Sequence, residues 1–303
     1  MTAVAAVKPP TGRLKPERID VGGAEIGLLR MGSTDRPPVL LVHGFSGDML
    51  TWQFNLAPLA RDYHVIAIDL PGHGLSSAAP GIGHWRAMVD WLALLVDTLG
   101  LERPHLIGHS LGGRLTLGLV EQGLIEARSL TLISCAGISP DHDYAFLERL
   151  AAIATIEDAR LCARHLFGSA KLDLDRFART LHTKLIEPDT RRAMAEFLER
   201  NFAEGKLLPV VPTDWRRVPC PLQIIWGRDD RLVPLPGAEW LPADRPIHLL
   251  DAVGHLPHLA APDRVNKLLG DFIREAGGGP ATAEAIDICA RHEACGPGEI
   301  IST

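Results

Sequence analysis

The sequence lacks an excess of positive charge and any long apolar run, and each lack excludes a class of partner. Its 31 Lys and Arg residues stand against 37 Asp and Glu residues, a formal net charge of −6, whereas a nucleic-acid binder normally carries a basic stripe. Apolar stretches such as residues 39–42 and 92–96 are far shorter than the roughly 20 residues that cross a bilayer. We therefore expect neither a nucleic acid nor a membrane as partner.

Cysteine is also scarce, and the five residues are odd in number and scattered along the chain: Cys135, Cys162, Cys220, Cys289 and Cys295. A disulfide framework would need an even, closely spaced set, so reduced thiols are the simpler interpretation. Residues 1–16 lack the basic start and apolar stretch of a secretory signal. Together these observations predict a cytoplasmic location.

The residues that are present indicate an α/β fold. Short apolar runs without polar alternation are typical of parallel strands buried on both faces; they occur at 39–42, 65–68, 106–107, 130–133, 222–226 and 247–250. Residues 85–99 and 111–122 carry apolar side chains at helical spacing. Residues 18–30 resemble two antiparallel strands joined at Gly22-Gly23. Strands alternating with helices predict a mostly parallel central sheet flanked by helices.

This alternation stops between residues 139 and 214, where helical spacing continues without a strand-like run and Gly168, Pro188 and Gly205 act as breaks. We expect an inserted helical cap, either a lid over the sheet's active edge or a mere helical elaboration of the core. The predicted α/β core is then residues 1–138 and 215–276. Residues 277–303 begin with a glycine run and are expected to form a flexible tail.

Within that tail, Cys289, His292 and Cys295 are spaced so that three ligands would share one helical face. Structural zinc normally takes four ligands, and no fourth is evident. Elsewhere the sequence has no His-Glu-x-x-His cluster, no Gly-x-Gly-x-x-Gly run and no Walker loop after a strand. We therefore predict no metal and no cofactor.

A Gly-x-Ser-x-Gly motif at 108–112 carries the first chemical signal, because it lies between a strand-like and a helix-like stretch. Such a turn holds the central residue, here Ser110, in a strained conformation at the mouth of the sheet. A serine hydroxyl becomes a useful nucleophile only when a base removes its proton and an acid orients that base.

Candidates for both partners follow in the order that this turn requires. Asp229 and Asp230 come directly after the strand-like run 222–226, and His255 and His258 follow the run 247–250. Open α/β sheets place their sites at the carboxyl ends of strands, so we expect one acid and one histidine from these loops to meet Ser110.

At this point the chain resembles the α/β-hydrolase superfamily over roughly residues 18–276. The matching motifs are His-Gly-Phe at 43–45, Asp-Leu-Pro-Gly-His-Gly-Leu-Ser at 69–76, the serine turn, Trp-Gly-Arg-Asp-Asp at 226–230 and Gly-His at 254–255. The resemblance implies that Ser110, Asp230 and His255 are catalytic, in preference to Asp229 and His258.

The same resemblance implies an oxyanion hole formed by the backbone N–H groups of Phe45 and Leu111. Phe45, Leu111, Val233 and Leu256 are expected to line the substrate pocket. The cap's apolar residues are further candidates for that lining: Phe146, Leu166, Phe167 and Phe177. His43, His73 and His109 are expected to be structural neighbours of the site.

More narrowly, the sequence resembles the hydrolase-like acyltransferase component of acetoin dehydrogenase systems, without the lipoyl domain that often precedes it. It also resembles the carbon–carbon hydrolases of aromatic ring cleavage, although 45–48 is Phe-Ser-Gly-Asp where those enzymes usually have Gly-Pro-Gly-Ala. We expect a small-molecule ester or activated acyl compound to be hydrolysed. Acyl transfer, carbon–carbon hydrolysis and non-catalytic ligand reception remain alternatives, and the oligomeric state is left open.

Overall fold

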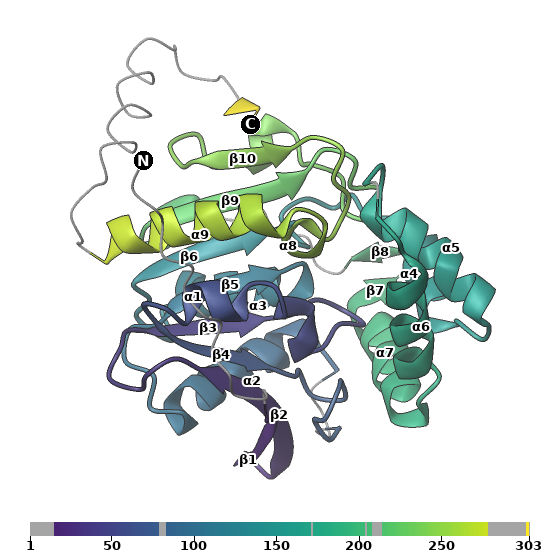
Figure 1. The fold of residues 1–303 in the computed structure, drawn as a ribbon, viewed down its shortest axis with the longest axis horizontal. Helices are drawn as coiled ribbons and strands as arrows, with labels where there is room; N and C mark the ends of the chain where they lie inside the picture. The colour runs from purple at the N-terminus through teal and green to yellow at the C-terminus, as the bar shows by residue number, and fades with distance from the viewer. Residues whose placement is uncertain are drawn as a thin grey trace, which may run out of the picture.

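A mixed sheet runs through the molecule, with its strands in the order β1-β2-β4-β3-β5-β6-β9-β10-β11 (Figure 1). The computed structural model describes residues 15–78, 83–170, 172–203, 205–207, 214–277 and 301–302. The strands are β1 (Glu17–Val21), β2 (Ala24–Met31), β3 (Pro38–Val42), β4 (His64–Ile68), β5 (His105–His109), β6 (Ser129–Ile133), β9 (Leu222–Gly227), β10 (Ile247–Leu250) and β11 (Ile301–Ser302). From β4 to β11 all pairings are parallel, so the sheet is mostly parallel, as the apolar runs predict.

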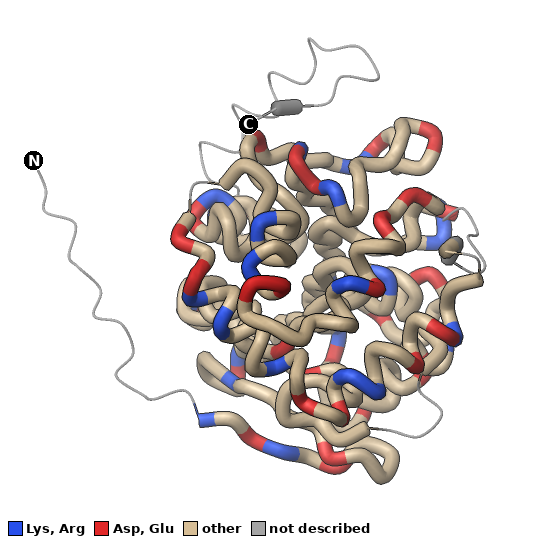
Figure 2. The backbone as a smooth tube through the Cα atoms, turned by 90° about the vertical axis from the view of Figure 1, so that its right-hand side faces the viewer, with Lys and Arg blue, Asp and Glu red and all other residues tan. Residues whose placement is uncertain are grey.

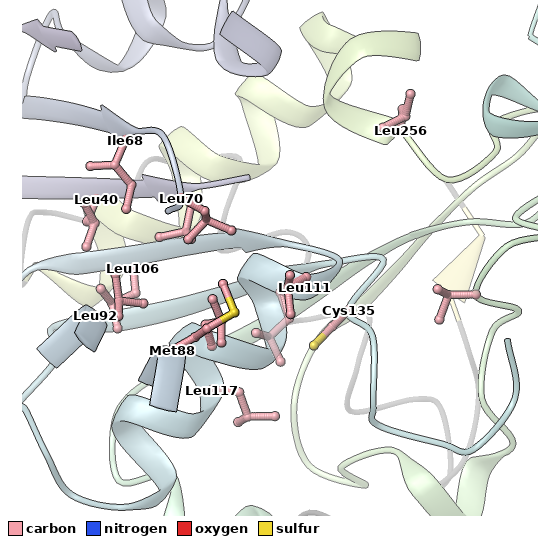
Figure 3. Close-up of a cluster of buried hydrophobic side chains, with 14 of the residues drawn as sticks. Leu40, Ile68, Leu70, Met88, Leu92, Leu106, Leu111, Leu117, Cys135 and Leu256 are labelled. Carbon is pink, nitrogen blue, oxygen red and sulfur yellow. The ribbon is translucent and has the colours of Figure 1, made fainter. Parts of the chain in front are cut away.

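Both faces of the sheet are buried, which explains the lack of polar alternation in its strands. In β3, Leu40 and Val42 belong to one apolar cluster while Val39 and Leu41 belong to the other. The first cluster includes α2 (Trp85–Thr98) and α3 (Leu111–Glu121), and the second includes α1 (Leu56–Leu59) and α9 (Pro262–Ala276). Figure 3 shows side chains of the first cluster, with Leu40 and Ile68 from the sheet and Met88, Leu92 and Leu117 from α2 and α3.

The first two strands confirm the predicted antiparallel pair. Val21 of β1 pairs with Ala24 of β2, and the turn between them has positive φ at both Gly22 and Gly23, a conformation that glycine adopts without steric cost. At the opposite edge, β11 adds two residues of the predicted tail beside β10. The other tail residues after 277, including Cys289, His292 and Cys295, lie outside the described residues.

In the described part of the segment between β6 and β9, four α-helices group at one side of the sheet (Figure 1). They are α4 (Tyr144–Ala151), α5 (Ile156–Phe167), α6 (Asp175–Leu185) and α7 (Pro188–Asn201). Of the predicted breaks, Gly168 caps the end of α5 and Pro188 begins α7. The expectation of no strand in this segment is wrong, because β7 (Phe202–Ala203) and β8 (Lys206–Leu207) form a small antiparallel hairpin around Gly205. Strands of two residues are too short to show alternation.

Acidic and basic residues are interspersed along the chain rather than gathered on one side (Figure 2). Among the described helices, none is long and apolar enough to cross a membrane. The remaining short helices are η1 (Met49–Trp52), η2 (Trp215–Arg217), η3 (Ala238–Trp240) and α8 (Pro257–Ala260).

Candidate active site

Ser110 lies in a sharp turn between β5 and α3. Its φ of 52° and ψ of −117° are a conformation that L-residues rarely adopt and that surrounding structure must enforce. The enforcing contacts are backbone hydrogen bonds: the Ser110 N–H donates to Ile133 (2.9 Å), and its carbonyl accepts from Arg114 and Ala136 (3.1 Å each).

Two glycines make this turn possible by allowing very close approach. A Cβ on Gly112 would lie 2.2 Å from the carbonyl oxygen of Val42, and one on Gly108 would lie 2.4 Å from that of Gly112. No side chain fits such gaps, so α3 packs directly against the end of β3. This physical requirement explains both glycines of the motif.

His255 joins Ser110 to Asp230 through two hydrogen bonds. Its Nε2 lies 2.9 Å from the Ser110 Oγ, and its Nδ1 lies 2.8 Å from Oδ2 of Asp230. The other carboxylate oxygen accepts the N–H groups of Leu232 and Val233 at 3.0 and 2.9 Å, which fixes the carboxylate in place. All three side chains are buried, so the structure brings together the three residues singled out by the sequence motifs.

The alternative residues occupy other positions. His258 lies in α8, with its Nε2 3.2 Å from the Thr51 hydroxyl and its ring tilted against that of Trp52 at a centroid distance of 4.5 Å. Burial together with the charge of His255 lowers the pKa of His258 to about 3. Asp230, and not Asp229, contacts the imidazole of His255.

His43 shapes the loop that contains Phe45. Its Nε2 accepts the Leu70 N–H (2.9 Å), so the proton must be on Nδ1, which donates to the Gly44 carbonyl at 2.8 Å. Gly47 donates to the same carbonyl at 3.0 Å. In a trans peptide the C=O and N–H point in opposite directions, so holding the Gly44 carbonyl also fixes the direction of the Phe45 N–H.

This loop lies against the serine, since a Cβ on Gly44 would be 2.8 Å from Cβ of Ser110. Within the described part of the chain, neither the Phe45 N–H nor the Leu111 N–H donates a hydrogen bond. Both donors are therefore available to an added oxygen. Burial and the nearby His73 lower the pKa of His43 to about 3, which keeps its ring neutral in this role.

His109 supports the backbone of the histidine loop. Its Nε2 donates to the carbonyl of His255 at 2.7 Å, and its ring lies between those of His255 and His258. Burial, with the added effect of neighbouring histidines, lowers its pKa well below the ordinary value. His109 is thus a neutral donor that positions the loop of His255.

The helical insert also holds this loop. The N–H groups of Gly254 and His255 donate to the carbonyls of Phe167 and Leu166 at 3.1 and 2.7 Å. These carbonyls belong to the last turn of α5, where helices leave carbonyls without intrahelical partners. Gly168, which follows, packs so closely that an added Cβ would lie 2.8 Å from Cβ of Asp229.

A cavity of about 370 Å³ opens in front of Ser110. All four predicted lining residues border it, namely Phe45, Leu111, Val233 and Leu256. From the insert, Leu166 and Phe177 border it as expected, whereas Phe146 packs instead on His165 and Phe167 packs on Phe177.

Charged residues at the cavity were not found from the sequence. Arg86, Arg114, Glu121, Lys184 and Arg217 all border it. Arg114 and Glu121 lie seven residues apart in the predicted helix after Ser110. This spacing identifies them as cavity residues only when the cavity is already known to run along α3. Within the described residues, no cluster of His, Cys, Asp and Glu is arranged to hold a metal.

Comparison with known proteins assigns this chain to a family. The family model described as "Alpha/beta hydrolase family" matches residues 39–268. The chain belongs to this family. It is 28% identical over 274 residues to the dihydrolipoyllysine-residue acetyltransferase component of the acetoin cleaving system of Pseudomonas putida, covering 86% of this chain and 70% of that protein. It is 27% identical to monoacylglycerol lipase abhd6-B of Xenopus laevis, covering 79% and 76% respectively.

A solved structure shares the fold of this family member. The 2-hydroxy-6-oxo-6-phenylhexa-2,4-dienoate hydrolase of a Rhodococcus strain superposes with a TM-score of 0.76 at 24% identity, covering 86% of this chain and 99% of that one. The resemblance to α/β-hydrolases inferred from the motifs is therefore confirmed, as are the relationships to an acetoin-system acyltransferase and, in fold, to a ring-cleavage hydrolase.

Proposed function

We propose that the protein is a serine hydrolase that cleaves a carboxylic ester, or a related activated acyl compound, through an acyl-enzyme. The observation that carries the proposal is the chain of hydrogen bonds from Asp230 through His255 to Ser110 (2.8 and 2.9 Å) at the edge of a cavity. This is the geometry in which a histidine can activate a serine hydroxyl.

In the proposed reaction, Nε2 of His255 takes the Ser110 proton as Oγ attacks the carbonyl carbon. The N–H groups of Phe45 and Leu111 hold the oxygen that becomes negative. The tetrahedral intermediate then collapses, the bond to the alcohol oxygen breaks, and His255 returns the proton to that oxygen. Water repeats the sequence on the acyl-enzyme and releases the acid. Asp230 keeps the proton on Nδ1 and stabilises the imidazolium.

The helical insert supplies much of the apolar wall of the cavity, and we assign it the role of a cap that shapes the acyl pocket. A panel of p-nitrophenyl esters from acetate to dodecanoate tests the function. The wild-type protein should show many turnovers, and Ser110→Ala should lose activity on the order of 10³-fold or more. Full activity in Ser110→Ala would contradict the proposal, and stoichiometric rather than repeated turnover would indicate a receptor.

Acyl transfer is the second candidate, because the Pseudomonas putida relative is named as an acetyltransferase component. The chemistry differs only in the acceptor, a thiol in place of water at the second step. Adding dihydrolipoamide to the p-nitrophenyl acetate assay separates the two. Faster release of p-nitrophenol with formation of the acetyl thioester would favour transfer, and an unchanged rate with acetate as product would favour hydrolysis.

A further inference from the structure

Aromatic side chains are scarce in the chain but gather at the cavity. The chain has 8 Phe, 6 Trp and 2 Tyr residues, which make up 5% of it. The residues that border the cavity include four of these phenylalanines and one tryptophan: Phe45, Phe177, Phe197, Phe202 and Trp85. Each of the five keeps part of its surface accessible, whereas Phe146 and Phe167, which pack elsewhere, are buried. Packing on the core therefore leaves ring surface free at the cavity.

Three of these phenylalanines form a row of ring contacts that joins the core to the insert. Phe45 contacts Phe197 of α7 with the ring centroids 5.5 Å apart, and Phe197 contacts Phe202 of β7 at 6.5 Å. His142, which also borders the cavity, packs nearly perpendicular to the ring of Phe202 at 5.0 Å. These distances lie in the range of favourable ring–ring contacts. We call Phe45, Phe197, Phe202 and His142 the aromatic wall.

The aromatic wall begins beside the reacting carbonyl, because the backbone N–H of Phe45 is one of the two oxyanion donors assigned above. The alcohol oxygen of the substrate must lie beside Nε2 of His255, which returns its proton. That side of the cavity is aliphatic: Leu256 follows His255 directly, and Leu232 and Val233 donate their N–H groups to the carboxylate that holds its imidazole. The aromatic wall belongs to other elements, so it is the part of the cavity left for the acyl group.

The part of the insert that carries the wall is anchored to the core by a fully buried amide. The Asn201 side chain accepts the Trp85 N–H at 2.9 Å and donates to the carbonyls of Gly83 and Phe197 at 2.7 Å each. Asn201 directly precedes Phe202 and lies about one helical turn after Phe197, so one side chain fixes the backbone near both rings. A wall held in this way is ordered before a ligand arrives, which favours affinity.

We propose that the aromatic wall is a subsite for an aromatic ring in the acyl group of the substrate. A ligand ring packed edge-on or offset against these rings extends the row, and such contacts add to the free energy gained by burying the ring. The cavity of about 370 Å³ has the size of pockets that take small organic ligands. The inference rests on the proposed function and narrows its substrate from carboxylic esters in general to esters of arylalkanoic acids.

The test compares methyl 3-phenylpropanoate with methyl 3-cyclohexylpropanoate, which have the same carbon skeleton. Transfer from water favours the cyclohexyl ring, which has more apolar surface, so a preference for phenyl reports ring–ring contact rather than hydrophobicity. We expect the phenyl ester to bind Ser110→Ala about fivefold more tightly, measured by calorimetry, and to show an about fivefold higher kcat/KM with the wild-type protein. Equal values for the two esters, or a preference for cyclohexyl, would overturn the proposal.

Phe197→Leu and Phe202→Leu each remove one ring but keep an apolar side chain. Each should reduce the phenyl preference and the double change should abolish it, whereas Phe197→Tyr, which keeps the ring, should retain it. Phe177→Leu is the matched control, because Phe177 borders the same cavity but packs on Phe167, outside the wall. A merely structural wall would weaken both esters alike and leave their ratio unchanged. A preference that survives the double change, or that Phe177→Leu removes, would contradict the assignment.

The outcome is separable from the proposed function. If Ser110→Ala retains full esterase activity while the phenyl preference follows Phe197 and Phe202, the subsite stands and the assigned nucleophile fails. If the serine is essential but the preference is absent, the hydrolase stands and the subsite fails.

Discussion

The core and the helical insert both border the cavity, but they hold their contributions in different ways. Around Ser110 the core uses backbone: a positive φ, two glycines in close contact and carbonyl–amide hydrogen bonds. The insert mainly contributes side chains of amphipathic helices, such as Phe177 and Lys184. The core therefore fixes the reacting groups within tight steric limits, whereas most of the insert can vary in shape without moving them.

One part of the insert departs from this pattern. Two carbonyls at the end of α5 accept hydrogen bonds from the loop of His255, and Gly168 packs on Asp229. This end belongs to the support of the reacting groups rather than to the variable wall. The insert therefore has two parts. The end of α5 supports the loops of Asp230 and His255, and the other helices form the wall of the cavity.

The largest effect is expected in the core, from Gly112→Ala. The added methyl group would lie 2.2 Å from the carbonyl oxygen of Val42, so α3 must move away from β3, and we expect a loss of about 3 kcal/mol or more in the free energy of unfolding. Gly270→Ala in α9 is the matched control, since its Cβ would meet only Arg274 at 4.0 Å and alanine should gain about 0.5–1 kcal/mol. Chemical denaturation measures both, and a stable Gly112→Ala protein would contradict the packing argument.

Gly168→Ala alters the end of α5 and should lower the rate of catalysis as well as the stability. Its φ is +61°, and the new Cβ would press on Asp229 at 2.8 Å; we expect about a tenfold lower kcat and roughly 2 kcal/mol less stability. Gly205→Ala has the same sign of φ (+73°), but its nearest neighbour is Tyr144 at 3.4 Å. The kcat for ester hydrolysis should distinguish the two variants, because Gly205→Ala is expected to lower the stability without lowering kcat. Equal kcat values would show that α5 does not support the site.

Acid sensitivity should arise from neutral histidines buried in the core. Burial, with a smaller effect of Arg128, lowers the pKa of His105 to about 4, below the unfolded value of about 6.5. Protonation therefore favours the unfolded chain, and stability is lost as pH falls from 6.5 towards 4. Between pH 7 and pH 5 this one group should cost about 2 kcal/mol.

Replacing the imidazole by His105→Asn should flatten that part of the pH dependence, which denaturant unfolding at each pH would record. Ser129→Ala keeps the imidazole but removes its hydroxyl partner at 2.8 Å, and should retain the slope. An unchanged slope in His105→Asn would assign the acid sensitivity to other groups.

The smallest effect is expected where the insert touches the core through side chains. Burial disfavours the charged form of Asp48, but the nearby Lys184 ammonium outweighs it and lowers the pKa of the carboxyl. Lys184→Met should cost about 1–2 kcal/mol by leaving this carboxylate unpaired. Adding Asp48→Asn should recover part of the loss, while Arg192→Met in an exposed pair should change stability by less than about 0.5 kcal/mol. No recovery in the double variant would contradict the ion-pair explanation.

The sequence predicts most of the core and locates the residues that meet at the site, because local motifs decide both. The strand ends carry glycine turns whose geometry depends partly on neighbours a few residues away, as at Gly108, where an added Cβ would meet the carbonyl oxygen of Gly112. Features that depend on contacts between distant segments were not predictable in this way. The pairing of Lys184 with Asp48 and the hydrogen bonds from the loop of His255 to the α5 carbonyls leave no periodicity or motif in the sequence. The strands β7 and β8 pair locally, but two residues each are too few to show alternation.

Labelling of Ser110 by a fluorophosphonate probe, followed by peptide mass spectrometry, tests the central claim most directly. If His255 activates Ser110 as the 2.9 Å contact indicates, the adduct should form on the Ser110 peptide, and His255→Ala should slow labelling about 100-fold or more. An adduct on another residue, or labelling that His255→Ala leaves at the wild-type rate, would contradict the account.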